Sequence, residues 1–146
     1  RADSMTAPTV TAKAATAKAL LDTSVFIASE SGRALDATAL PDESFISIIT
    51  LAELRVGLHA AVDTQTRAVR LKTLEAIADV DALTVDADAA GHWAMLRFRL
   101  HEVGRRANVN TVWIASVALA HGLPVVTQDH DFDVLTGLGG PEIIRV

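Results

Sequence analysis

The chain has 146 residues, of which half are hydrophobic, and a formal net charge of −5 at pH 7. This length and apolar fraction favour one domain with one sizeable core, and the acidic balance argues against indiscriminate binding to nucleic acid. The chain contains no cysteine, which excludes disulfides, thiolate zinc sites and a cysteine nucleophile and favours a reducing, cytoplasmic location. Its apolar runs are far shorter than the roughly 18 residues that a membrane span requires, so no membrane association is expected.

The first 16 residues are mostly small and lack the continuous apolar centre of a signal peptide. We expect residues 1–16 to be a flexible tail and residues 17–146 to form the folded domain. Met5 follows Arg-Ala-Asp-Ser, a pattern that suggests a start preceded by an expression remnant in residues 1–4.

The first expected strand is residues 18–22, a short apolar run that ends in an acid. Residues 44–50, Ser-Phe-Ile-Ser-Ile-Ile-Thr, are rich in β-branched side chains and predict a second, buried strand. A helix over residues 51–62 would follow, with Thr50 and Glu53 forming a capping box at its start.

Helical periodicity predicts three further helices, at residues 64–78, 87–104 and 110–122. Short apolar runs at residues 123–127 and 142–146 predict the last two strands. This alternation of strands and helices is typical of an α/β domain with a mainly parallel central sheet.

Three acids that are far apart in the sequence follow predicted strands. Asp22 and Asp129 come at the carboxyl ends of their strands, and Glu53 lies in the first turn of the helix after a third strand. In sheets of this kind the functional crevice lies beyond the carboxyl ends of the strands. We therefore expect the three carboxylates at one rim of the sheet.

Clustered carboxylates repel each other and are stable mainly when a divalent cation neutralises them. Mg²⁺ and Mn²⁺ prefer oxygen ligands, and either can support the attack of water on phosphorus. A purely structural role is the alternative, because each acid could instead cap a helix or a turn. A third interpretation is phosphoaspartate chemistry with Asp22 as nucleophile, although a second acid two residues later and a well-placed lysine are missing.

Eight of the 13 basic residues lie between Arg55 and Arg106. They predict either a local basic rim on an acidic protein or simply solvated helix faces.

Three motifs occur in order along the chain: LLDTSVFIA, SIITLAELRVGL and NVNTVWIASVALAHGLPVVTQDHDFD. In order and separation they resemble the PIN-domain ribonucleases, specifically the VapC toxins of bacterial toxin–antitoxin pairs, and the likeness covers residues 19–146. The resemblance implies a three-layer α/β/α domain that cuts RNA with Mg²⁺ or Mn²⁺. It also implies a homodimer that a VapB antitoxin holds inactive in a hetero-oligomer.

The acids of this family correspond to Asp22 in LLDTS, Glu53 in LAEL and Asp129 in VTQD. The resemblance makes them the catalytic residues and the metal ligands. It also implies that Ser24 supports the first acid, and Thr127 the last, through hydrogen bonds.

The sequence departs from the family pattern at Thr111, where a hydroxyl stands in place of an expected aspartate. Thr111 removes one negative charge, although its hydroxyl can still hydrogen-bond a water in the site or serve in the first turn of a helix. Three interpretations remain open: a natural variant that is active with fewer acids, one that binds without cutting, or a sequence altered to suppress toxicity. Asp131 is either an outer acid of the site or a surface turn residue.

Overall fold

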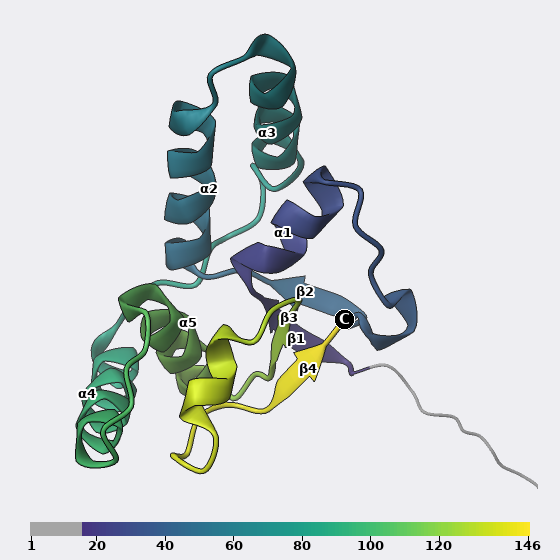
Figure 1. Cartoon of the computed structure of the whole chain (residues 1–146). Coiled ribbons are helices and arrows are strands. Elements are labelled where there is room, and N and C mark those ends of the chain that lie inside the picture. Colours follow the sequence, from purple (N-terminus) through teal and green to yellow (C-terminus); the bar gives the residue numbers. More distant parts are fainter. Residues whose placement is uncertain (1–15) are drawn as a thin grey trace, which may run out of the picture.

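A computed structural model describes residues 16–146 of the chain (Figure 1). The predictions for residues 1–15, including the remnant and the start at Met5, lie outside the described residues. The carbonyl of Thr16 accepts a hydrogen bond from the Asp42 amide at 3.0 Å. Within the described part, no helix combines the length and apolar character that a membrane span needs.

Four parallel strands form the sheet, in the order β2-β1-β3-β4. They are β1 (Lys18–Leu21), β2 (Glu43–Phe45), β3 (Val125–Thr127) and β4 (Ile143–Arg145). Because all four strands run in the same direction, their carboxyl ends share one edge of the sheet. The prediction of a mainly parallel sheet is confirmed.

In the described part of the chain, five α-helices connect and cover the strands: α1 (Thr23–Glu30), α2 (Ile48–Ala60), α3 (Thr64–Ala76), α4 (Ala87–Glu102) and α5 (Val109–Ala120). The last three agree with the helices predicted from periodicity to within about two residues at each end, the usual uncertainty of helix boundaries. Within residues 16–146, two short 3₁₀ helices, η3 (Ala37–Ala39) and η4 (Asp131–Leu135), were not predicted.

Side chains that alternate along the central strands fill two separate cores, one on each face of the sheet. Leu20 and Val125 belong to a core built with α4 and α5, whereas Ala19 and Val126 pack with Val25 of α1. Figure 1 shows α4 and α5 on one side of the sheet and α1 on the other. The chain therefore has three layers, as the resemblance implied.

The predicted strand over residues 44–50 is wrong in its second half. Strand β2 ends at Phe45, and α2 begins at Ile48 with Ser47 as its N-cap. The Ser47 hydroxyl accepts a hydrogen bond from the Thr50 amide at 3.1 Å, so Thr50 already lies inside the helix. The predicted capping box of Thr50 with Glu53 is therefore also wrong, and Glu53 is free for another role.

Candidate active site

Asp22 lies where β1 ends, and it is the N-cap of α1. Its oxygen Oδ2 accepts hydrogen bonds from the Ser24 hydroxyl at 2.7 Å and from the Thr127 hydroxyl at 3.0 Å. The residue is only 6% exposed. Burial raises the pKa of Asp22, and the Asp129 carboxylate raises it further, while the two hydroxyl bonds oppose the shift. Asp22 is thus the N-cap of a helix, and burial disfavours the charged form of its side chain.

The fully buried Thr127 connects the ends of β1 and β3. Its hydroxyl lies 3.3 Å from Oδ1 of Asp129 and accepts a hydrogen bond from the Asp129 amide at 3.2 Å. The Ser24 hydroxyl in turn accepts one from the Gln128 amide at 2.9 Å. The hydroxyl of Thr127 carries a single proton, so it cannot donate to Asp22 and Asp129 at the same time. The structure thus contains the hydrogen bonds expected of Ser24 and Thr127.

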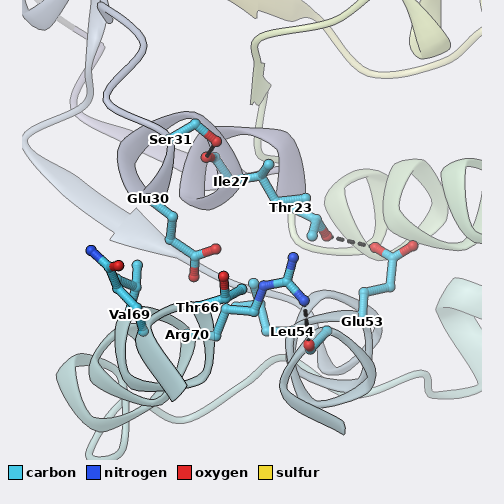
Figure 2. A pocket seen from close by; sticks show the side chains of 11 residues that line it. Thr23, Ile27, Glu30, Ser31, Glu53, Leu54, Thr66, Val69 and Arg70 are labelled. Atoms are coloured by element: carbon cyan, nitrogen blue, oxygen red, sulfur yellow. Dashed lines mark hydrogen bonds between the residues drawn. The ribbon is translucent and has the colours of Figure 1, made fainter. Parts of the chain in front are cut away.

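Glu53 extends from α2 toward the ends of β1 and β3, and both of its oxygens accept hydrogen bonds. The Thr23 hydroxyl donates to Oε1 at 2.5 Å, a contact drawn in Figure 2, and the Asn110 amide Nδ2 donates to Oε2 at 3.1 Å. These donors come from α1 and α5, so three helices together fix the orientation of one half-buried carboxylate.

One cavity of about 170 Å³ receives all of these acids. It is lined by Asp22, Thr23, Ser24, Ile27, Glu53, Asn108, Thr111, Ile114, Asp129 and Asp131. The structure therefore brings together the three predicted acids, together with Ser24, Thr111 and Asp131 from the supporting set. We call this space the acidic cavity.

The acidic cavity offers oxygen atoms and no basic side chain. None of the ion pairs in residues 16–146 involves an acid of this cavity. The same residues contain no group of three or more His, Cys, Asp or Glu side chains arranged closely enough to hold a metal ion by themselves. Mg²⁺ commonly takes only one or two carboxylates, with water and phosphate oxygens as its other ligands. Asp22 and Asp129 fit that smaller requirement, whereas Glu53 is already engaged by protein donors.

Thr111 occupies the first turn of α5, where its amide lies 3.4 Å from the side-chain oxygen of the N-cap residue Asn108. It is 6% exposed and lines the acidic cavity. An aspartate at this position would add a carboxylate to that lining. The departure from the family pattern therefore lies at the site itself.

Asp131 begins η4 at the rim of the acidic cavity, and its amide donates to Oδ1 of Asp129 at 3.0 Å. The residue is exposed. Partial burial of its carboxyl raises the pKa of Asp131, and the charges of Asp129 and Glu53 raise it further. Asp131 is therefore an exposed residue that also lines the acidic cavity, and the charges of Asp129 and Glu53 act on its carboxyl group.

A larger groove of about 420 Å³ adjoins the acidic cavity between α1, α2 and α3 (Figure 2). The two spaces share Thr23, Ile27 and Glu53. Apolar side chains such as Leu54 and Val69 line the groove beside polar and charged ones. We call it the helical groove.

Sequence reasoning missed the roles of Thr23 and Asn110. Both hold Glu53, but each hydrogen bond joins residues of different helices, 30 and 57 positions apart. No local pattern reports such a contact. The only available signal was that Asn110 directly precedes the unusual Thr111.

Comparisons with known proteins agree with this geometry. Residues 19–138 match the family model of the PIN domain. The chain is 56% identical over 130 residues to Ribonuclease VapC5 of Mycobacterium tuberculosis, covering 89% of this chain and 96% of that protein. It is 36% identical over 115 residues to Ribonuclease VapC4 of the same organism, covering 79% of this chain and 88% of that protein.

Solved structures give the same result. A crystal structure of VapBC-5, from a toxin–antitoxin system of M. tuberculosis, matches with a TM-score of 0.82 and 52% identity, covering 89% of this chain and 99% of that one. A DNA-bound VapBC structure from Salmonella typhimurium matches with a TM-score of 0.72 and 25% identity, covering 88% and 98%. The chain therefore belongs to the PIN domain family, in its VapC ribonuclease branch.

Proposed function

We propose that the chain is the toxin of a VapBC-type pair and that it hydrolyses RNA phosphodiester bonds at the acidic cavity with Mg²⁺ or Mn²⁺. One observation carries this proposal. Asp22 and Asp129 stand at the ends of neighbouring parallel strands, both within hydrogen-bonding reach of the Thr127 hydroxyl, with no cationic side chain lining their cavity. Asp22 is buried and Asp129 is half-buried, and two neighbouring carboxylates in such surroundings favour a divalent cation.

In this proposal Asp22 and Asp129 hold the metal ion. When bound, the ion would supply Lewis-acid chemistry, lowering the pKa of water and neutralising charge on the leaving oxygen. Ser24 and Thr127 keep the two carboxylates in place through their hydroxyls. Glu53, fixed by Thr23 and Asn110, either orients the attacking water or adds a ligand.

We further propose that a VapB-type antitoxin occupies the helical groove. Two features support this assignment: Ile27, Leu54 and Val69 give the groove an apolar part, and Glu53 also lines it. An amphipathic segment laid in such a groove could place an arginine next to the carboxylates, where it would compete with the metal ion. A homodimer within the toxin–antitoxin assembly is also proposed, since Phe98 (61% exposed) leaves apolar surface to cover.

The test is cleavage of a mixed RNA pool by the purified, antitoxin-free chain in Mn²⁺, in Mg²⁺ and in EDTA. Asp22→Asn serves as the site variant. Asp81→Asn, an exposed acid outside the acidic cavity, is the matched control. We expect cleavage that needs the metal, is abolished in Asp22→Asn and is retained in Asp81→Asn. Undiminished cleavage in Asp22→Asn would show that another site, or a contaminant, does the cutting.

A second candidate function is binding of RNA or antitoxin without cleavage, and Thr111 is the observation that favours it. This candidate predicts weak Mn²⁺ binding and no cleavage above the Asp22→Asn background. The phosphoaspartate alternative gains no support, because no lysine lines the acidic cavity.

A further inference from the structure

Another cavity, of about 370 Å³, lies where α4 ends and the chain turns into α5. It is lined by Arg97, Leu100, His101, Arg105, Arg106, Ala107 and Val109. Three of these residues are arginines, one is a histidine and none is acidic. The lining of this cavity is therefore basic, although the chain as a whole has a net charge of −5. We call this space the basic cavity.

The basic cavity and the acidic cavity lie on either side of one short stretch of backbone. Ala107 and Val109 line the basic cavity, whereas Asn108 between them lines the acidic one. Asn108 is also the N-cap of α5 and accepts a hydrogen bond from the Asn110 amide at 2.8 Å. The boundary between the two cavities is therefore a hydrogen-bonded helix start.

An acidic cavity alone is a poor place for RNA to dock, because its carboxylates repel the phosphates on either side of the bond to be cut. Cationic groups placed beside the acids overcome this repulsion, and releasing counterions from the RNA supplies the affinity. We propose that the basic cavity binds the sugar-phosphate backbone of single-stranded RNA next to the cleaved bond. This inference rests on the proposed ribonuclease function and adds the site that positions the substrate.

The three arginines differ in how strongly the fold holds them. The Arg97 guanidinium lies 5.7 Å from the ring centroid of Trp93, which stacks on Trp113 at 4.7 Å. Arg105 donates from Nη1 to the carbonyls of Val134 (3.1 Å) and Thr136 (2.8 Å).

Arg106 is exposed and makes no side-chain hydrogen bond or ion pair with any other residue in the range 16–146. It is therefore the residue whose loss changes charge with the least effect on folding. Arg97 is the second choice, because its guanidinium packs on the Trp93 ring and its side chain makes no hydrogen bond to the backbone within residues 16–146.

The experiment measures binding of a fluorescein-labelled, mixed-sequence 20-nucleotide RNA by anisotropy in EDTA, across a series of salt concentrations. The full chain is compared with Arg106→Gln, Arg97→Gln and the double variant. Arg33→Gln, which removes an exposed arginine outside both cavities, is the matched control. Arg106→Lys tests rescue, since a phosphate contact needs charge more than shape.

Each lost phosphate contact should make the slope of log K against log salt less negative by about 0.7 and weaken binding roughly fivefold at 0.1 M salt. We expect these losses in Arg106→Gln and Arg97→Gln, larger losses in the double variant, and recovery in Arg106→Lys. If the wild-type chain binds and cuts RNA while the double variant matches Arg33→Gln in slope and affinity, the basic cavity is not the docking site and the proposed function still stands. A wild-type chain that neither binds nor cuts RNA would overturn both.

Discussion

The hydroxyl of Thr127 lies 3.0 Å from Oδ2 of Asp22, although 105 residues separate them in the sequence. The contact joins the last residue of β3 to the residue that follows β1, and these strands are neighbours in the sheet. It is one of the few bonds that offset the burial of Asp22. The sheet topology therefore both creates the acidic pair and supplies the group that holds it.

Thr127→Val should destabilise the metal-free chain. The substitution keeps the shape of the side chain and removes the hydroxyl, leaving a buried carboxylate with one donor fewer, which costs about 1–3 kcal/mol. Urea unfolding at neutral pH in EDTA measures this loss. Thr84→Val, at an exposed position, should stay within about 0.5 kcal/mol of wild type. Equal stability of the two variants would mean that the hydrogen bond from Thr127 to Asp22 contributes nothing to the free energy of unfolding.

The contribution of Asp22 to the stability of the metal-free chain should fall as pH rises above the usual Asp pKa of 3.8. Burial raises the pKa of Asp22, so between 3.8 and the raised value the folded state binds more protons than the unfolded state, and the free energy of unfolding decreases with pH. Below 3.8 the carboxyl is protonated in both states and the contribution of Asp22 is complete.

The check is urea unfolding of wild type and Asp22→Asn in EDTA, from about pH 4 to pH 7. All other carboxylates are present in both proteins, so the difference between the two stability curves reports the contribution of Asp22. The decline should be shallower in Asp22→Asn and unchanged in Asp81→Asn. A decline of the same size in wild type and Asp22→Asn would show that burial does not perturb this carboxyl.

Thr111→Asp should bind Mn²⁺ more tightly than wild type, on the order of tenfold, because it adds a carboxylate to the cavity that already holds Asp22 and Asp129. Isothermal titration with Mn²⁺ measures the affinity. Thr84→Asp adds the same charge at an exposed position outside that cavity and should leave the affinity unchanged. If both variants gained equally, the effect would be a general one of net charge.

The same variant separates the interpretations of Thr111 in the cleavage assay. A wild-type rate lost in Asp22→Asn would identify a site that works without the fourth acid. Cleavage that appears only in Thr111→Asp would identify a chain that binds and does not cut.

Asn110→Ala should lower the cleavage rate by about 10-fold to 100-fold, as losses of groups that orient an active-site residue commonly do. The amide of Asn110 donates to Oε2 of Glu53, and without it Glu53 keeps only its bond from Thr23. A double-mutant cycle with Glu53→Gln tests this link, because Asn110→Ala should add little once Glu53 is changed. Fully additive losses would place the role of Asn110 elsewhere.

The sequence predicted most of the fold because its helices have strong periodicity and clear ends. The failure at residues 44–50 has a physical cause. Ile46, Ile48 and Ile49 form a short apolar run, and such runs do not distinguish a buried strand from a helix start. Ser47 ends the extended segment and starts the helix. Its hydroxyl caps α2, and its backbone pairs with Leu83 in an isolated parallel bridge.

The site was predictable where it depends on topology alone. Asp22 and Asp129 follow parallel strands, so their convergence required only that these strands be neighbours. The orientation of Glu53 was not predictable, because it depends on how α1 and α5 pack beside α2 and bring Thr23 and Asn110 within reach. The basic cavity likewise exists only once α4 and the turn into α5 are placed.

The most direct test of the central claim, that Asp22 and Asp129 together hold a divalent cation, is Mn²⁺ binding followed by electron paramagnetic resonance. Wild type, Asp22→Asn, Asp129→Asn and Asp81→Asn would be titrated under the same conditions. We predict that wild type and Asp81→Asn bind Mn²⁺ equally and that each of the two site variants loses at least about tenfold in affinity. Mn²⁺ binding that is the same in all four proteins would contradict the account.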